Sequence, residues 1–353
     1  MEYPDFEMIS NNCFMPHEEV LKYFNDYSKH FQLIDNIMFE CVVRKVKFDG
    51  NIWNVKIENF KNKTIFERQF DVVVLCQGRF GTPLYSDCNG IENFKGQILH
   101  SHDYRTADMF KNKKIFVIGS GFSGTDIAIE LSQVSDNVYL LDRKEKPWFN
   151  QLGNVNLING NLVQFTETGA EIEMIKTKER IELKDIETVF VSTGYRINLD
   201  ILDKNCGITT NSDNTVDGLY RHVINIAHPT LAVIGINSFV PPSKLFYIQS
   251  LFFINHLLKK FKLPTIQEME RRNDQEIRIK LKNGFRKKDR HKFTQYLIED
   301  YFRQMENEAG LGLIIKPVYF RIYENIHKNM CEIPLGFKNI IYHVINDEEF
   351  LIE

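Results

Sequence analysis

Apolar positions near the start of the chain first recur at helical spacing and then alternate. Between residues 18 and 30 they lie three or four positions apart, which is typical of an amphipathic helix. Residues 37–46 become strand-like, and residues 51–59 place apolar side chains at every second position after the turn pair Asp49-Gly50. The pattern therefore predicts a helix that leads into a β-hairpin.

Three later runs, residues 70–76, 188–192 and 231–236, are apolar at nearly every position. Such runs are typical of strands that are buried on both faces of a parallel sheet. In open α/β sheets, ligands bind beyond the carboxyl ends of the strands. We therefore predict that Gln77-Gly78 after the first run and Thr193-Gly194-Tyr195 after the second face a ligand, although ordinary turns are the alternative. After Pro264 the chain is predicted to be polar and mainly helical.

A strand, a glycine-rich turn, a helix and a second strand follow one another between residues 114 and 141. This is the order of a right-handed βαβ unit, so the expected fold class is α/β. The first glycine of such a turn permits the tight bend, the second lets the main chain approach a pyrophosphate, and the third lets helix and strand pack closely. The helix N-terminus then faces the phosphates. The predicted dinucleotide-binding residues are Gly119, Ser120, Gly121, Phe122, Ser123 and Gly124.

The second strand of this unit ends in Asp142-Arg143-Lys144, about 20 residues after the glycines. An acidic residue at this place accepts a hydrogen bond from the ribose 2′-hydroxyl of NAD, whereas an arginine binds the 2′-phosphate of NADP. Both kinds of residue are present. We favour NADP, with Arg143 as the phosphate-binding residue, and leave NAD open.

Composition narrows the range of partners. The chain has 44 basic and 47 acidic residues and a net charge of −3, so no global field favours nucleic acid or an anionic membrane. The six cysteines form no CxxC pair, which favours reduced thiols in the cytoplasm. No apolar run is long enough to cross a bilayer, and the N-terminus does not look like a secretory signal. We expect a cytoplasmic protein that binds small molecules.

Two histidines, His100 and His102, lie two positions apart, but no cysteine or acidic residue recurs with them at the spacing of metal ligands. No metal site is predicted, and we expect His100 to be a connector residue packed on the core. The sequence also shows no nucleophile elbow and no paired carboxylates, so no catalytic side chain is proposed.

Residues 94–104, FKGQILHSHDY, match the FxGxxxHxxx(Y/F) signature of flavin-containing monooxygenases and their N-hydroxylating relatives. Together with the GxGxSG form of the glycine-rich turn, this motif is specific. The sequence resembles that family, which includes the dimethylaniline monooxygenases, over roughly residues 1–270 and more loosely beyond.

The resemblance implies two dinucleotide-binding, Rossmann-like domains. An FAD-type domain would comprise residues 1–104 and 189–353, and an NADP-binding domain at residues 105–188 would be inserted into it. Gln77, Gly78 and residues 193–195 would then approach the flavin or lie at the crossover between domains.

The resemblance also implies an activity in which the cofactors supply the chemistry. NADPH would transfer a hydride to FAD, and the reduced flavin would bind dioxygen as a C4a-hydroperoxide. A soft nitrogen or sulfur nucleophile of a small molecule would then take one oxygen atom. Peripheral attachment to the endoplasmic reticulum is left open beside a cytoplasmic location.

The sequence departs from the family at its N-terminus. The family begins with a βαβ unit whose own GxGxxG binds the FAD pyrophosphate, whereas this sequence starts just before the segment Tyr3-Pro-Asp-Phe6, and its first 50 residues contain one glycine, Gly50. We therefore expect this first βαβ unit to be missing. The alternative function is a catalytically inactive NADP-binding remnant or fragment of such an enzyme. A disulfide reductase is disfavoured because the sequence has no CxxC pair.

Overall fold

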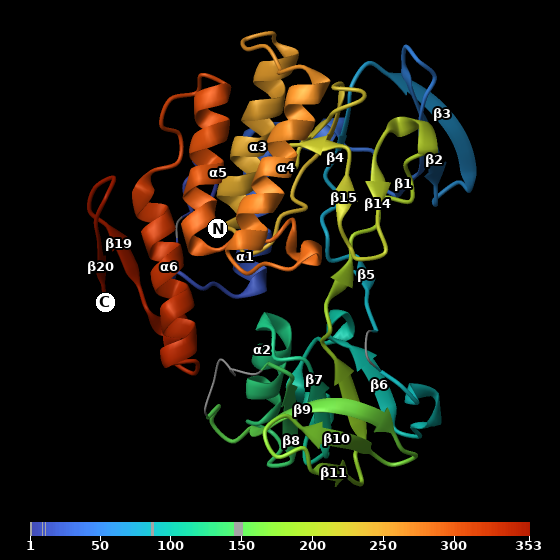
Figure 1. Cartoon of the computed structure of the whole chain (residues 1–353), viewed down its shortest axis with the longest axis vertical. Helices are drawn as coiled ribbons and strands as arrows, with labels where there is room; N and C mark the ends of the chain where they lie inside the picture. The colour runs from blue at the N-terminus through green and yellow to red at the C-terminus, as the bar shows by residue number, and fades with distance from the viewer. Residues whose placement is uncertain (1, 9, 11, 86–87, 145–150) are drawn as a thin grey trace. The chain divides into compact units, whose positions relative to one another are not determined.

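The computed structural model describes residues 1–353 except residues 1, 9, 11, 86–87 and 145–150 (Figure 1). The described chain forms two compact units. The first unit comprises residues 1–81, 197–325 and 339–353, and the second unit comprises residues 82–196 and 326–338. The second unit extends beyond residues 105–188, the range expected for an inserted domain, because the strand at residues 97–100 belongs to its sheet.

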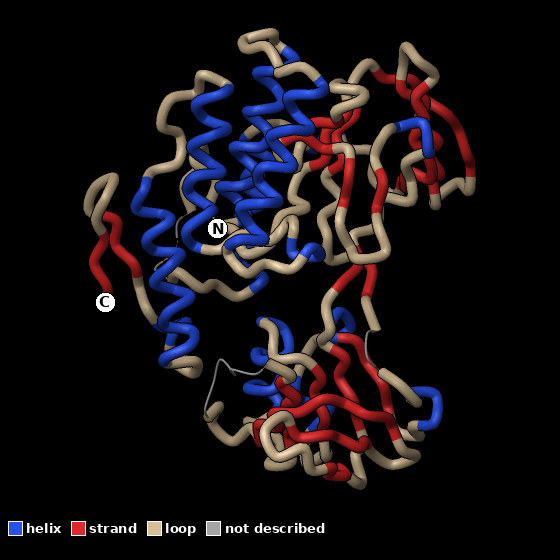
Figure 2. Tube along the Cα trace, viewed as in Figure 1, coloured by secondary structure: helices blue, strands red, loops and turns tan. Residues whose placement is uncertain are grey.

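The second unit is built on a seven-stranded sheet in the order β11-β10-β9-β8-β7-β12-β6. Figure 2 shows the strands in red. The strands β6, β12, β7, β8 and β9 run parallel, and β10 and β11 add an antiparallel edge. A short pair, β5 (Thr82–Pro83) and β13 (Tyr195–Arg196), lies outside this sheet. The strands of the large sheet are β6 (Gln97–His100), β7 (Ile115–Ile118), β8 (Val138–Asp142), β9 (Asn156–Phe165), β10 (Ala170–Met174), β11 (Arg180–Leu183) and β12 (Thr188–Val191).

Strand β7 shows why its sequence is apolar at every position. Phe116 and Ile118 belong to the apolar cluster on one face of the sheet, and Ile115 and Val117 belong to the cluster on the other. Helix α2 (Phe122–Leu131) adds Ile127, Ala128 and Leu131 to the second cluster. The predicted βαβ unit is therefore confirmed as β7, α2 and β8.

The first unit contains the predicted helix and hairpin. The helix is α1 (His17–His30), and the hairpin is formed by β1 (Cys41–Phe48) and β2 (Trp53–Asn59), with β3 (Thr64–Phe70) as a third antiparallel strand. The turn brings Phe48 opposite Trp53, and Gly50 supplies its positive φ of +102°. The structure therefore confirms both elements that the periodicity of the sequence predicted.

The prediction that residues 70–76 form one strand buried on both faces is wrong. Phe70 ends β3, whereas Val73–Leu75 forms β4, which pairs in parallel with β18 (Leu231–Val233). Because β4 is an outer strand of the four-stranded sheet β16-β17-β18-β4, Val74 remains 42% exposed while Leu75 is buried. The run at residues 231–233 is buried throughout, as predicted.

The rest of the first unit is mainly helical, as predicted for the chain after Pro264. The helices pack against the four-stranded sheet through an apolar core that includes Phe252, Phe302 and Ile224. None of the described helices is long and apolar enough to cross a membrane. The remaining elements are β14 (Thr209–Thr210), β15 (Val216–Asp217), β16 (Leu219–Tyr220), β17 (Ile224–Asn225), α3 (Pro242–Leu257), α4 (Ile266–Lys282), α5 (Gln295–Glu308), α6 (Pro317–Glu332), β19 (Tyr342–Val344) and β20 (Phe350–Ile352).

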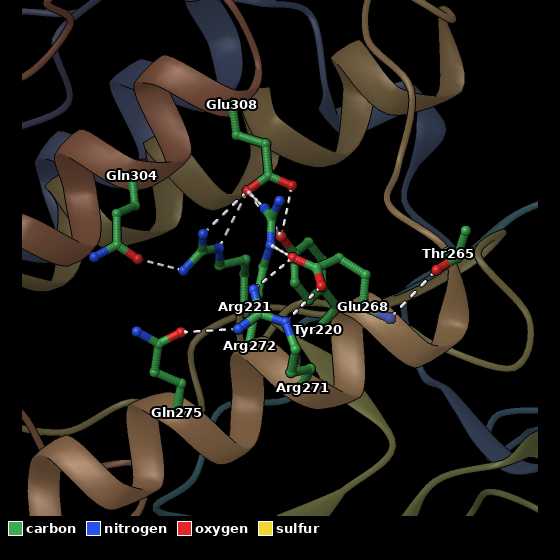
Figure 3. Close-up of polar contacts among 9 residues, drawn as sticks. All are labelled: Tyr220, Arg221, Thr265, Glu268, Arg271, Arg272, Gln275, Gln304 and Glu308. Atoms are coloured by element: carbon green, nitrogen blue, oxygen red, sulfur yellow. Dashed lines mark hydrogen bonds and ion pairs between the residues drawn. The ribbon is translucent and has the colours of Figure 1, made fainter.

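A polar network attaches the β16–β17 hairpin to helices α4 and α5 (Figure 3). The Tyr220 hydroxyl lies 2.6 Å from Glu308 Oε1, and Arg221 Nη2 lies 3.2 Å from Glu308 Oε2. From α4, Arg272 reaches both Tyr220 and Glu308. Arg221 and His222 form the turn with φ values of +53° and +58°, a conformation that costs free energy for residues with a Cβ. The network holds this turn in place.

His222 belongs to a second, buried network. The main-chain N–H of Val216 donates to His291 Nε2 at 2.9 Å, so the proton of a neutral His291 is on Nδ1. This Nδ1 donates to His222 Nδ1 at 2.8 Å, and His222 Nε2 donates to Glu276 Oε1 at 2.8 Å. Lys280 Nζ lies 3.0 Å from the same carboxylate oxygen. Every hydrogen bond in this series is satisfied when both imidazoles are neutral.

Candidate functional site

The glycine-rich turn follows β7 and has the geometry that its spacing predicts. Gly119 has φ +101°, and a Cβ there would lie 2.6 Å from the Ser192 carbonyl oxygen. A Cβ on Gly124 would lie 1.9 Å from the Gly119 carbonyl oxygen. These two positions require glycine because the main chain of β12 and of the turn itself occupies the space of a side chain.

Gly121 differs from these two glycines. It is the N-cap of α2, and no heavy atom lies within 4 Å of the place where its Cβ would be. The first turn of a helix has main-chain N–H groups without intrahelical partners, and its dipole favours an anion. Space for a ligand and donors for a phosphate therefore coincide at residues 121–124, where the sequence places Phe122 and Ser123.

A lysine that the sequence prediction left out of the site lies beside this turn. Lys144 Nζ is 2.9 Å from Ser120 Oγ and 3.8 Å from Asp142 Oδ1. Ser120 and Asp142 are both 5% exposed, whereas Arg143 is an exposed residue at the end of β8. The available signal was the run Asp142-Arg143-Lys144 itself, in which only the middle residue was selected.

A partly buried asparagine on β9 fixes the main chain at this end of β8. Asn159 Nδ2 donates to the carbonyl oxygen of Asp142 at 2.9 Å and to that of Lys144 at 2.8 Å. The main-chain N–H of Lys144 donates in turn to the Asp142 carboxylate at 3.0 Å. These hydrogen bonds therefore hold the main chain of Asp142-Arg143-Lys144 in one conformation.

Two buried hydroxyl groups lie around the same turn. Ser192 Oγ follows β12, and Thr125 Oγ1 is in the first turns of α2; neither has a hydrogen-bond partner among the described residues. A Cβ on Gly124 would lie 3.1 Å from the Ser192 Cβ, so this hydroxyl group is close to the glycines. The cradle, the helix N-terminus and the nearby cation fit a dinucleotide phosphate, and its binding here stays a prediction.

Residues 193–195 continue from β12 in the same unit. Gly194 has φ +96° with open space at its Cβ position, and its carbonyl oxygen accepts from Leu84 N at 3.0 Å. Thr193 Oγ1 donates to the Leu84 carbonyl oxygen. The structure therefore brings Thr193, Gly194 and Tyr195 into the unit that holds the glycine-rich turn.

His100 is held as a packed residue of this region. It is fully buried, and its Nδ1 accepts from the main-chain N–H of His102 at 3.1 Å. Its Nε2 therefore carries the proton of the neutral ring and donates to the Gly194 carbonyl oxygen at 3.1 Å. Burial lowers the pKa of His100, which favours this neutral form. The expected connector role agrees with this environment.

The predicted pair Gln77-Gly78 belongs to the first unit instead. Both residues are exposed, Gly78 has φ +69° with open space at its Cβ position, and Gln77 Nε2 donates to the Asn198 carbonyl oxygen. The predicted site residues are thus divided between two units. Residues 119–124, 143 and 193–195 lie in the second unit, and residues 77–78 follow β4 in the first.

Comparison with known proteins places these features in one family. The flavin-binding monooxygenase-like family model matches residues 1–151. Senecionine N-oxygenase of Tyria jacobaeae is 29% identical over 97% of this chain and 73% of its own length. Flavin-containing monooxygenase FMO GS-OX-like 7 of Arabidopsis thaliana is 33% identical over 72% of this chain, and the match spans 54% of that relative.

A solved structure shows the same fold. S-allyl-L-cysteine S-oxygenase from Allium sativum superposes with a TM-score of 0.84 at 26% identity, over 96% of this chain and 78% of the other. Tmm from Pelagibacter, at 20% identity and a TM-score of 0.83, shares the fold. The chain belongs to the flavin-binding monooxygenase-like family.

Proposed function

We propose that this protein is an NADPH- and FAD-dependent monooxygenase that oxygenates soft nitrogen or sulfur atoms of small molecules. The observation that carries the proposal is the glycine-rich turn, with its open space at Gly121 and a lysine ammonium group 2.9 Å from Ser120. The names of its relatives, an N-oxygenase and an S-oxygenase, support the choice of substrate atoms. Dioxygen is the proposed oxygen donor.

The charges around the turn favour NADPH over NADH. The Asp142 carboxylate, which would accept from the ribose of NAD, already accepts from Lys144 N at 3.0 Å and has the Lys144 ammonium group 3.8 Å away. A 2′-hydroxyl would compete with this cation for the carboxylate. A 2′-phosphate would instead gain charge-assisted hydrogen bonds from Arg143 and Lys144. We therefore assign both basic residues to the 2′-phosphate.

Two open glycine turns, one in each unit, are proposed cofactor-contacting positions. Gly78 and Gly194 both have positive φ values and no heavy atom within 4 Å of their Cβ positions. Packing therefore does not explain these glycines, and a ligand could approach the main chain closely at either turn. When bound, FAD would accept the hydride of NADPH and react with dioxygen. Residues 77–78 would orient the flavin in the first unit, and residues 193–195 are proposed to contact a cofactor in the second unit.

An isotope experiment tests this function. The chain is incubated with FAD, NADPH, ¹⁸O-labelled dioxygen and a thioether or tertiary amine, and the product is examined by mass spectrometry. We expect a sulfoxide or N-oxide that carries one labelled oxygen atom and does not form without FAD. NADPH binding without any labelled product at saturating FAD would instead support the inactive NADP-binding alternative.

A further inference from the structure

Arg79, in the loop after β4, has no anionic partner among the described residues. Its Nη1 donates to the Ile236 carbonyl oxygen at 2.7 Å. Its Nε is buried and has no hydrogen-bond partner in the part of the chain that the structure describes. Among the residues that the structure describes, no carboxylate forms an ion pair with this guanidinium group, and burial lowers the pKa of Arg79 without an opposing charge.

Such an arrangement is costly in the free protein. Removing a cation from water carries a desolvation penalty that is offset only when an anion and well-placed hydrogen bonds replace the water. For Arg79 the single acceptor is a neutral carbonyl group. The edge formed by Nε and Nη2, which binds carboxylate or phosphate in a bidentate manner, remains available.

A second unpaired donor, on Asn237, lies next to the residue that Arg79 contacts. Asn237 is 4% exposed, and no described residue forms a hydrogen bond with its Nδ2. The orientation of this amide is determined by Gln249, whose Oε1 accepts from Gly235 N at 2.9 Å. Gln249 must therefore donate through Nε2, and it does so to Asn237 Oδ1 at 2.8 Å and to the Tyr301 hydroxyl at 2.9 Å. Asn237 consequently presents its NH₂ group away from Gln249.

Both donors lie at one edge of the sheet. Strands β4 and β18 are parallel, and Leu75 is paired with Val233, so the chain leaves both strands on the same side. Arg79 follows one strand and Asn237 follows the other. Gly78, with open space at its Cβ position, lies next to Arg79. Ligands of open α/β sheets bind at this kind of edge.

We propose that Arg79 and Asn237 form an oxyanion-binding site at the carboxyl edge of the β4–β18 pair. The Nε–Nη2 edge of Arg79 binds two oxygen atoms of the anion, and Asn237 Nδ2 donates to it. This site belongs to the first unit, whereas the NADPH phosphates are assigned to residues of the second unit. Its oxyanion is a phosphate group of the flavin dinucleotide or the carboxylate of an acidic substrate, and both sources rest on the proposed function.

The test compares the wild type with R79M, which keeps a long apolar side chain and removes the charge. Inorganic pyrophosphate and acetate are titrated separately against the full chain by calorimetry, with NADP⁺ present to occupy the glycine-rich turn. R68M is the matched control, because Arg68 is an exposed arginine of the same unit. We expect R79M to weaken pyrophosphate binding by about tenfold or more, as loss of charge-assisted hydrogen bonds does, and R68M to leave it unchanged.

The two anions distinguish the sources. If pyrophosphate binds in an Arg79-dependent manner and acetate does not, the site is assigned to a dinucleotide phosphate. If acetate binds, the site is assigned to a carboxylate. In a second variant, N237D, the unpaired donor becomes an acceptor of the same shape, so a bound oxyanion would face a like charge. We expect N237D to fold and to bind either anion at least about tenfold more weakly than the wild type.

Thermal unfolding without ligand distinguishes an anion-binding role of Arg79 from a structural one. Because the cation lacks an anion, R79M is expected to unfold at the same temperature as the wild type or higher. A structural arginine would give the opposite result, a lower unfolding temperature and unchanged anion binding. Unchanged binding of both anions in R79M and N237D would overturn the proposal. NADP⁺ binding, measured in the same samples, reports separately on the proposed function.

Discussion

The glycine-rich turn of the second unit and the β4–β18 edge of the first unit are built from different groups. At the turn, main-chain atoms form the cradle, and a Cβ on Gly124 would lie 1.9 Å from a carbonyl oxygen. At the β4–β18 edge, the donors are side chains, Arg79 and Asn237, whose orientations depend on Ile236 and Gln249. One arrangement needs particular main-chain angles, and the other needs particular long-range neighbours.

This difference explains why only one of the two is visible in a sequence. A main-chain cradle requires glycine at fixed spacing, so it leaves a local motif. The Arg79 and Asn237 donors are 158 positions apart in the sequence, and neither residue type is unusual where it stands. Their unpaired state appears only when the partners of every nearby polar group are known.

The largest expected effect concerns the two kinds of glycine in the turn. G124A would force a methyl group against the Gly119 carbonyl oxygen. We therefore expect the free energy of unfolding to fall by about 1–3 kcal/mol and NADPH binding to weaken. G121A has open space at Cβ and φ −75°, so it should fold normally and yet bind NADPH weakly, because its methyl group enters the ligand space. Thermal unfolding and NADPH titration measure both. Wild-type NADPH binding by G121A would refute the cradle assignment.

The basic residues at the end of β8 test the choice of cofactor. R143M and K144M should each raise the dissociation constant of NADPH by about tenfold, since each removes a charge-assisted hydrogen bond to the 2′-phosphate. The dissociation constant of NADH should change little. K176M, which removes an exposed lysine of the same unit, is the control. Equal losses for the two nucleotides would remove both residues from the 2′-phosphate site.

Acid should destabilise the first unit through its buried histidines. Burial lowers the pKa values of His222 and His291 below the ordinary value of 6.5. The unfolded chain then binds protons that the folded chain does not, so the stability from the neutral pair is present above about pH 6.5 and is lost as the pH falls. The groups facing the pair are Glu276, Lys280, Arg290 and Arg79.

Thermal unfolding between about pH 7 and about pH 5 measures this effect. Burial alone would raise the pKa of Glu276, but His222 and Lys280 lower it below its ordinary value of 4.5, so the contribution of this carboxylate is lost only at a pH below this range. We expect a steeper pH dependence in the wild type than in H291Q. H343Q, which removes a half-exposed histidine, should retain the wild-type slope. The same slope in H291Q and H343Q would contradict the neutral network.

The ion pairs of Glu308 on helix α5 and of Glu268 on helix α4 differ in burial, and the exposed pair at Glu268 has the smallest expected effect. Glu308 is 13% exposed and contacts Tyr220, Arg221 and Arg272, so E308Q should cost about 1–3 kcal/mol by leaving these donors short of a charged acceptor. Glu268 pairs with Arg271 and Arg272 at the surface, and E268Q should change stability very little. Urea unfolding of both variants tests the ranking, and a larger loss in E268Q would reverse it.

Local periodicity predicted the fold where each element contains its own signal. The helix at residues 17–30, the hairpin after Asp49-Gly50 and the βαβ unit around Gly119 were all predicted from spacing. The run at residues 70–76 was misjudged because apolarity alone does not show that Phe70 pairs with Trp53 in one sheet while Val73–Leu75 pairs with β18 in another. Sheet membership is decided by distant partners.

The candidate site shows the same limit. The glycines and Arg143 were selected from the sequence because the dinucleotide fingerprint is local. Lys144 was not selected, since its role depends on a contact with Ser120, 24 positions earlier. Arg79 was also missed, although it directly follows the predicted pair Gln77-Gly78, because a sequence does not show that a cation lacks its anion.

The visible absorption spectrum of the purified chain, recorded with added FAD and then with NADPH under anaerobic conditions, tests the central claim most directly. The account predicts protein-bound flavin that NADPH bleaches and that air restores, with slower bleaching in G121A because its NADPH binding is weakened. Flavin that stays unbound, while NADPH still binds to the glycine-rich turn, would contradict the monooxygenase assignment and leave a nucleotide-binding protein.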